Sequence, residues 1–159
     1  MVLELAHADE AFGFGVVAPV VLSVWRARVT ADVFRRAMPV FERCVARIAG
    51  PSAYVSVVEP ASSPPPAEVL AALRGGDAAP TLVRMVVVLE GDPPWLASGV
   101  DVLTSIIPNG RSGRRIKVCV DLREGLQWLT RQPEPHVAAA LLPRLERGID
   151  ALRATPPSG

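Results

Sequence analysis

The order in which hydrophobic periodicity changes along the chain is the feature that most constrains its fold. Two short runs rich in β-branched apolar residues come first, and segments of helical and strand period then alternate. This order predicts an α/β domain built on one mixed, mostly parallel sheet of about five strands with helices packed against it. The predicted strands are Phe12–Val17, Val20–Val29, Ala53–Val58, Leu82–Glu90 and Ile116–Val120, and the predicted helices are Ala31–Ile48, Pro66–Arg74, Pro93–Ile107, Leu122–Thr130 and about Glu134–Arg153.

The two ends of this pattern are less regular. The weak segment Leu3–Ala11 predicts a short turn, and Pro19 separates Phe12–Val17 from the next strand, which is typical of an antiparallel edge strand. The last helix is an addition at the C-terminal end, interrupted by Pro143. We expect a single domain over residues 1–153 and a disordered tail over 154–159.

The first helix has the clearest signals. Thr30 is placed to cap its N-terminus, and apolar residues recur at steps of three and four, so that one side is suited to packing on a sheet. Pro39 lies inside the pattern and predicts a kink near Arg35. The opposite side is basic and is interpreted either as a solvated face or as a docking face. It carries Arg35, Arg36, Glu42, Arg43 and Arg47.

Composition excludes several functional classes. Half of the residues are hydrophobic, and the formal net charge of +1 does not favour nucleic acid or an anionic membrane as a partner. No apolar run is long enough for a membrane span, and the N-terminus does not resemble a signal peptide, so a cytoplasmic protein is expected. Cys44 and Cys119 fall at apolar positions and are predicted to be small buried residues without a disulfide.

The residue types needed for catalysis or metal binding are not arranged in a recognisable motif. The two histidines, His7 and His136, are far apart, and no Gly-x-Ser-x-Gly segment is present. Gly13-Phe14-Gly15 lacks the third glycine of a dinucleotide fingerprint. The sequence therefore predicts no catalytic residue, no metal site and no cofactor.

A family resemblance follows from the order of the elements and from two segments. The segment Trp25–Thr30 with its following helix is similar to the turn into the first helix of STAS domains, the fold of anti-sigma factor antagonists. The segment Arg115–Leu129 looks like the last strand and helix of many bacterial SpoIIAA-like proteins. The resemblance covers residues 12–130 and implies a STAS-like fold and a non-enzymatic regulatory or protein-interaction role.

The resemblance also implies a position for a phosphorylated serine, at the start of the helix after the third strand. Ser62 and Ser63 occupy this position, but no Asp precedes them and Pro64 follows where the family motif has Gly. The two serines are thus candidates for a phosphorylation or docking site, or they are residues that cap a helix and fill a loop. Together with Arg36 and Arg43 they form the predicted surface for a protein partner.

A glycine-hinged basic loop provides a second hypothesis. Arg111, Arg114 and Arg115 lie in the segment Asn109–Lys117 and are candidates for binding a phosphate or a carboxylate, or they belong to a solvated turn. This hypothesis describes a protein that binds a small anionic or lipid-like ligand between the helices and the carboxyl edge of the sheet. No aromatic residues for base stacking lie nearby, so sequence-specific binding of nucleic acid is not expected.

Self-association is a further prediction that the sequence leaves open. Trp95, Trp128 and the apolar sides of the last helices either complete the core or form the interface of a homodimer.

Overall fold

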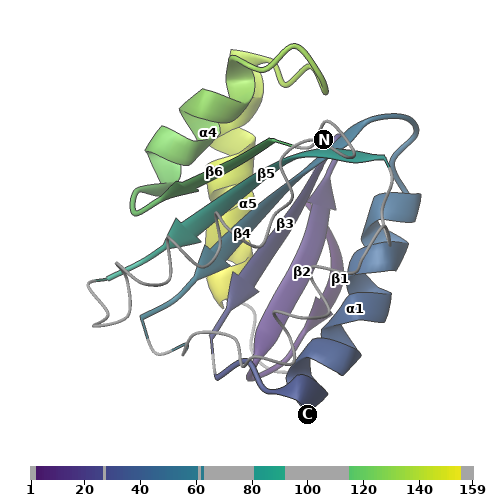
Figure 1. Cartoon of the computed structure of the whole chain (residues 1–159), viewed down its shortest axis with the longest axis vertical. Helices are drawn as coiled ribbons and strands as arrows, with labels where there is room; N and C mark the ends of the chain where they lie inside the picture. The colour runs from purple at the N-terminus through teal and green to yellow at the C-terminus, as the bar shows by residue number, and fades with distance from the viewer. Residues whose placement is uncertain (1–2, 27, 61, 63–80, 92–114, 155–159) are drawn as a thin grey trace.

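The computed structural model describes residues 3–26, 28–60, 62, 81–91 and 115–154 of the chain. Six strands and three α-helices are defined within these residues (Figure 1). They are β1 (Glu4–Ala8), β2 (Phe12–Val17), β3 (Val20–Trp25), α1 (Ala31–Ala46), β4 (Ser52–Val58), β5 (Leu82–Leu89), β6 (Arg115–Cys119), α4 (Leu122–Thr130), the short 3-10 helix η1 (Ala139–Leu141) and α5 (Leu142–Ala154).

The strands form one sheet in which spatial order follows chain order, β1-β2-β3-β4-β5-β6. The pairs β1–β2 and β2–β3 are antiparallel, whereas β3–β4, β4–β5 and β5–β6 are parallel. This arrangement confirms the predicted α/β class with a mixed, mostly parallel sheet, and the sheet has six strands where about five were expected.

The additional strand is β1, so the prediction of a short turn over Leu3–Ala11 was wrong. The strand lacks the apolar alternation by which a strand is recognised, and pairing with β2 holds it in the sheet with an irregularity between Leu5 and His7. The segment Phe12–Val17 was predicted to be an edge strand. This was wrong, because β1 lies outside it and makes it an inner strand. All six of its residues are buried.

The second predicted strand ends earlier than its apolar pattern suggested. β3 stops at Trp25, whereas Val29 was the predicted limit. The backbone N–H of Arg26 still donates to the carbonyl of Ala11, after which the chain turns toward α1. Thr30 then caps this helix, because its Oγ1 accepts a hydrogen bond of 3.2 Å from the N–H of Val33.

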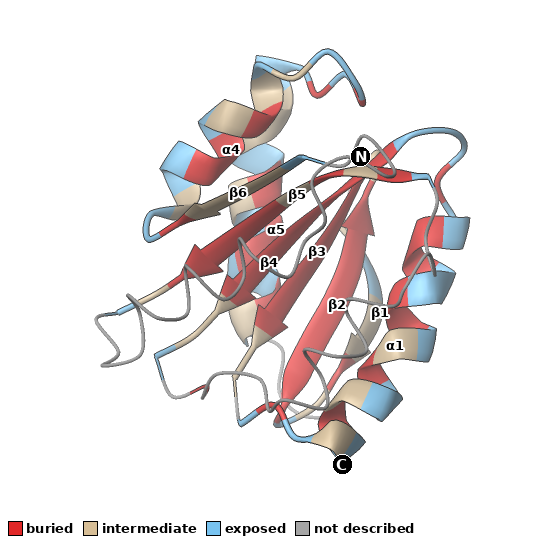
Figure 2. Cartoon of the chain, viewed as in Figure 1, coloured by how far each residue is buried: buried red, intermediate tan, exposed pale blue. Residues whose placement is uncertain are grey.

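Helix α1 continues through Pro39, and its buried positions follow the predicted apolar stripe. Figure 2 shows buried residues on the side that faces the sheet and exposed residues on the opposite side. The buried residues are Val33, Ala37, Val40, Phe41, Cys44 and Val45.

The C-terminal helices agree with the prediction in part. Asp121 caps α4 by accepting a hydrogen bond of 3.1 Å from the N–H of Arg123. Glu124, three residues after the cap, forms an ion pair of 3.4 Å with Lys117. The last helix starts at Leu142 and not near Glu134. Pro143 therefore lies in its first turn, where a missing N–H is tolerated, and does not interrupt the helix.

Helices cover the two faces of the sheet differently. Helices α4 and α5 pack on one face, which we call the aliphatic face because its buried cluster holds only aliphatic side chains and Cys119. Helix α1 packs on the other, aromatic face, where five rings contact one another. These rings belong to Phe12, Phe14, Trp25, Phe41 and Tyr54.

Helix α5 is attached at the edge of the sheet where the parallel strands end. Arg153 contacts Glu90 through both terminal nitrogens of its guanidinium group, Nη1 and Nη2, with 2.8 Å between Nη1 and Oε2. Arg26 donates from its guanidinium group to the carbonyl of Leu152. These contacts fix the end of α5 against β3 and β5.

Two predicted helices, Pro66–Arg74 and Pro93–Ile107, lie outside the described residues, as do positions 155–159 of the predicted tail. Ala154, the first residue of that tail, is instead the last residue of α5. None of the helices in the described part of the chain has the length and apolar character to cross a bilayer.

Candidate functional site

Several polar contacts that link separate elements lie near the edge at which β3 to β6 end, the carboxyl edge of the sheet. β2 is antiparallel to β3, so the turn between β1 and β2 also lies at this edge. Helix α1 begins here, because its cap Thr30 closely follows the end of β3. Carboxyl edges are where open α/β sheets usually place functional groups.

Asp9 organises the turn between β1 and β2. Its Oδ1 accepts hydrogen bonds from the backbone N–H groups of Ala11 at 2.7 Å and Phe12 at 3.0 Å. Its Oδ2 contacts Nε2 of His7 at 2.9 Å. Burial of the carboxyl group opposes ionisation, but the hydrogen bonds from His7, Phe12 and Ala11 outweigh it and lower the pKa of Asp9 from 3.8 to about 2. Asp9 is therefore a permanent anion at neutral pH.

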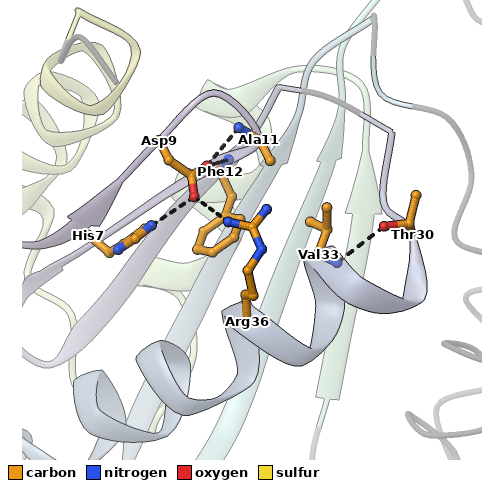
Figure 3. Close-up of polar contacts among 7 residues, drawn as sticks. All are labelled: His7, Asp9, Ala11, Phe12, Thr30, Val33 and Arg36. Carbon is orange, nitrogen blue, oxygen red and sulfur yellow. Dashed lines mark hydrogen bonds and ion pairs between the residues drawn. The ribbon is translucent and has the colours of Figure 1, made fainter. Parts of the chain in front are cut away.

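Arg36 of α1 joins this anion to the helix (Figure 3). Its Nη1 donates to Oδ2 of Asp9 at 3.0 Å, and its guanidinium carbon lies 5.6 Å from the ring centroid of Phe12. The ring of His7 stacks on the same phenyl ring with 4.9 Å between centroids. A cation, an anion and two rings thus connect β1, β2 and α1.

A line of basic side chains continues along the same side of α1. Arg36, Arg43 and Arg47 follow one another at steps of seven and four residues, which places them on one side of a helix. Nη1 of Arg47 lies 4.0 Å from Oε2 of Glu4 at the start of β1. Arg43 lies between these two contacts and forms no ion pair within the described residues. We call this surface the α1–β1 seam, and it consists of Glu4, His7, Asp9, Arg36, Arg43 and Arg47.

The structure brings some predicted site residues together and separates others. Arg36 and Arg43, two of the candidates for partner docking, are exposed residues of the α1–β1 seam. Ser62 follows β4 at the carboxyl edge but is only 1% exposed, and its backbone N–H donates to the carbonyl of Glu59 at 2.9 Å. Its hydroxyl therefore does not lie on the surface that a kinase reaches. Ser63 is outside the described residues.

Arg115, the one predicted anion-binding residue that the structure describes, does not lie at the carboxyl edge. Arg115 is exposed and begins β6, a strand parallel to β5, so it lies at the opposite, amino edge of the sheet. The hypothesis of a ligand at the carboxyl edge held by this arginine is thus not compatible with its position. Arg111 and Arg114 are outside the described residues.

The residues considered for self-association are also divided. Trp128 is partly buried and packs against the cluster of the aliphatic face, as expected for a residue that completes the core. Trp95 lies outside the described residues.

Both cysteines are buried and free, and burial raises the pKa of the thiols of Cys44 and Cys119.

A buried network of hydroxyl groups on the aromatic face was missed by the sequence analysis. Oγ of Ser23 and the hydroxyl oxygen of Tyr54 are 2.6 Å apart, and Nε1 of Trp25 donates to Oγ of Ser56 at 3.0 Å. Burial strongly disfavours the phenolate and raises the pKa of Tyr54. Each of these bonds joins residues 31 positions apart, so neighbouring letters give no signal for them.

The described residues contain no group of three or more His, Cys, Asp or Glu side chains that could hold a metal ion.

Comparison with known proteins finds no matching family model and no matching curated protein. The chain is similar in structure to an uncharacterized protein of the DUF3478 family from Shewanella loihica PV-4, described as having a SpoIIAA-like fold. The likeness has a TM-score of 0.45 at 14% sequence identity and covers 81% of this chain and 96% of that one.

Proposed function

We propose that this protein is a non-enzymatic regulatory module of the cytoplasm that binds an acidic segment of a protein partner through the α1–β1 seam. The observation that carries the proposal is the position of Arg43. This arginine is exposed between two seam contacts that already pair Arg36 with Asp9 and Arg47 with Glu4.

The fixed position of Arg36 supports a docking role for the seam. Asp9 and the ring of Phe12 hold its guanidinium group, so less side-chain entropy remains to be lost when a partner binds. Arg43 supplies the positive charge that is not neutralised by a described carboxylate, although Glu42 precedes it in the sequence. A carboxylate of a partner has favourable geometry for a charge-assisted bond with a guanidinium group.

The burial of Ser62 changes which part of the predicted docking surface we place at its centre. The resemblance implied a serine that a kinase modifies, but this hydroxyl is not accessible in the folded protein. We therefore centre the surface on α1, and recognition by charge takes the place of recognition through the serine loop.

Charge reversal at Arg43 tests this proposal. The purified protein and the Arg43→Glu variant would be used as baits with crosslinking in a cell extract, and captured proteins would be identified by mass spectrometry. We expect a captured protein with an acidic segment, and we expect its synthetic segment to bind the Arg43→Glu variant at least about tenfold more weakly, as for loss of a charge-assisted hydrogen bond.

A matched control separates a local effect from the overall change in charge. Arg144 is an exposed arginine in the first turn of α5, and Arg144→Glu changes the net charge by the same amount. Equal weakening by both variants, or binding that does not fall with added salt, would contradict docking at the seam. Light scattering of the same samples shows whether the bound partner is a second copy of this chain, as in a homodimer.

A further inference from the structure

We propose, on the basis of the function proposed above, that protonation of His7 strengthens the binding of an acidic partner segment at the α1–β1 seam. His7 belongs to this seam, and its side chain is 36% exposed, so its ring can exchange protons with the solvent. Histidine is the side chain that ordinarily changes its charge between pH 5 and 8. The seam therefore responds to a change in pH that carboxylates and guanidinium groups ordinarily do not follow.

The contact with Asp9 determines which nitrogen of His7 gains the proton. Nε2 of His7 lies 2.9 Å from Oδ2 of Asp9, and an ionised carboxylate can only accept a hydrogen bond. Nε2 of the neutral ring therefore carries the hydrogen that it donates to Asp9, and Nδ1 is the nitrogen that gains a proton. Nδ1 has no hydrogen-bond partner among the described residues, so its protonation breaks no bond there (Figure 3).

The charge that His7 gains is not neutralised within its cluster. Oδ2 of Asp9 already accepts a hydrogen bond of 3.0 Å from Nη1 of Arg36, and Oδ1 accepts the backbone N–H groups of Ala11 and Phe12. One carboxylate thus balances one guanidinium group. A proton on His7 raises the formal charge of the three side chains from zero to one, and this charge adds to the basic surface of the seam.

The strands and the turn around His7 offer no second carboxylate that pairs with it. Strand β2, on which the ring of His7 stacks, carries no charged side chain. Glu4 of β1 lies 4.0 Å from Nη1 of Arg47. Glu10 of the turn is exposed and forms no ion pair with His7. A carboxylate of a partner is therefore favoured as the counter-charge of the protonated ring.

Two arginines of α1 bring a partner's carboxylates close to His7. Arg43 follows Arg36 by seven residues, which corresponds to about 10 Å along the helix axis. This is about one Debye length at physiological ionic strength, so a short acidic segment that contacts both arginines is attracted by the charge on His7. Protonated His7 and Arg36 also repel each other, because both lie against Oδ2 of Asp9, and a further carboxylate reduces this repulsion.

The experiment measures the binding of hexa-aspartate, a synthetic acidic peptide, by isothermal titration calorimetry at pH 5.5 and pH 8.0 at constant ionic strength. The carboxylates of the peptide are ionised at both pH values. We expect the native protein to bind about two- to fivefold more tightly at pH 5.5, as for one additional exposed ion pair. Binding of equal affinity at the two pH values would overturn the role of His7 alone. Absence of binding at both would contradict the seam as a docking surface and this regulation with it.

Substitutions at both histidines of the chain locate the effect. His7→Gln keeps an N–H donor for Asp9, and His7→Phe keeps a ring against Phe12, but neither new side chain titrates. In both variants the ratio of the affinities at the two pH values should fall to about one. His136→Gln changes the exposed histidine between α4 and η1 and should keep the native ratio. A native ratio in both His7 variants would overturn the proposal.

NMR of the native protein without peptide follows the same proton and needs no variant that might misfold. The Cε1–H signal of His7 should move between pH 5 and 8, as is usual for histidine. The backbone amides of Ala11 and Phe12 donate to Asp9, so their signals should move with the same midpoint. Amides that do not follow His7 would show that its charge does not reach Asp9, which would overturn the proposed coupling.

Discussion

The two faces of the sheet are built from different chemistry. The buried cluster of the aliphatic face consists of Val, Leu, Ile and Ala side chains with Cys119, and none of these aliphatic side chains needs a hydrogen-bond partner. The aromatic face combines five rings with the hydroxyl groups of Ser23, Ser56 and Tyr54. Aliphatic packing tolerates small shifts, whereas buried polar groups are costly if they lose their partners. The aromatic face therefore specifies the register of β3 against β4.

The largest effect that distinguishes the two faces is expected from Phe14→Ala. Phe14 is buried and contacts the rings of Phe12, Trp25, Phe41 and Tyr54. Loss of these contacts and the resulting cavity should lower the free energy of unfolding by about 3–5 kcal/mol, measured by urea denaturation.

Ile149→Ala is the matched change on the aliphatic face, where the side chain is also buried. It should cost about 2–5 kcal/mol but change the near-ultraviolet circular dichroism less than Phe14→Ala does, because Trp128 is the one described aromatic side chain packed against this cluster. A change in that spectrum as large as the one caused by Phe14→Ala would show that the faces are not independent.

Asp9→Asn should have the next largest effect, and it has a definite pH dependence. The pKa of Asp9 is lowered from 3.8 to about 2 in the folded protein, so its ionised form stabilises the fold above pH 4. This contribution, about 2 kcal/mol, is lost as the pH falls from about 4 through 2. The difference in unfolding free energy between native protein and variant should therefore be large at pH 7 and small at pH 2.

Asp121→Asn provides a control for this experiment on the aliphatic side of the sheet. Asp121 caps α4 through its side chain, and asparagine caps a helix equally well. A stability loss in Asp121→Asn equal to that in Asp9→Asn would mean that the loss reflects general charge effects and not the contacts of the turn.

Tyr54→Phe tests the hydroxyl network. The change removes the partner 2.6 Å from Oγ of Ser23 and leaves that buried group without this bond, at a cost of about 1–2 kcal/mol. The double variant Ser23→Ala, Tyr54→Phe should be less destabilised than the sum of the two single variants, because the partners then disappear together. Simple additivity in denaturation experiments would argue against a direct bond.

Arg36→Ala should affect stability less than Phe14→Ala, Asp9→Asn or Tyr54→Phe. Its guanidinium group is largely exposed, so loss of the contacts to Asp9 and to the ring of Phe12 should cost about 0.5–1 kcal/mol. Arg123→Ala removes an exposed pair with Glu146 that has no ring beneath it, at 3.3 Å. In thermal denaturation we expect Arg123→Ala to lower stability less than Arg36→Ala does. A larger loss of stability for Arg123→Ala would contradict the role assigned to the ring of Phe12.

Prediction from sequence succeeded where one element is recognisable from its own residues. The N-cap at Thr30 and the apolar stripe of α1 are local patterns, and the structure has them where they were expected. The strand β1 was missed because Leu5, one of its apolar residues, is 49% exposed and the segment has no buried alternation of its own.

The candidate sites could not be predicted for a different reason. The bond between Arg36 and Asp9 joins residues 27 positions apart, and the contact of Arg47 with Glu4 depends on how α1 packs beside β1. The basic face of α1 was visible as a pattern. The sequence did not show that Asp9 pairs with Arg36 and Glu4 with Arg47, while Arg43 forms no ion pair within the described residues. Contacts of this kind follow from tertiary structure, which a window of neighbouring residues does not contain.

The order of the strands has a consequence for synthesis of the chain on the ribosome. Each strand pairs only with strands that are adjacent in the sequence, so the sheet can grow by one strand at a time as the nascent polypeptide emerges. Helix α5 emerges after all of them, and yet it packs against β2 and β3, with Gly148 close to Leu22. One side of the earliest strands therefore stays open to water, and to chaperones, until translation has passed the last helix.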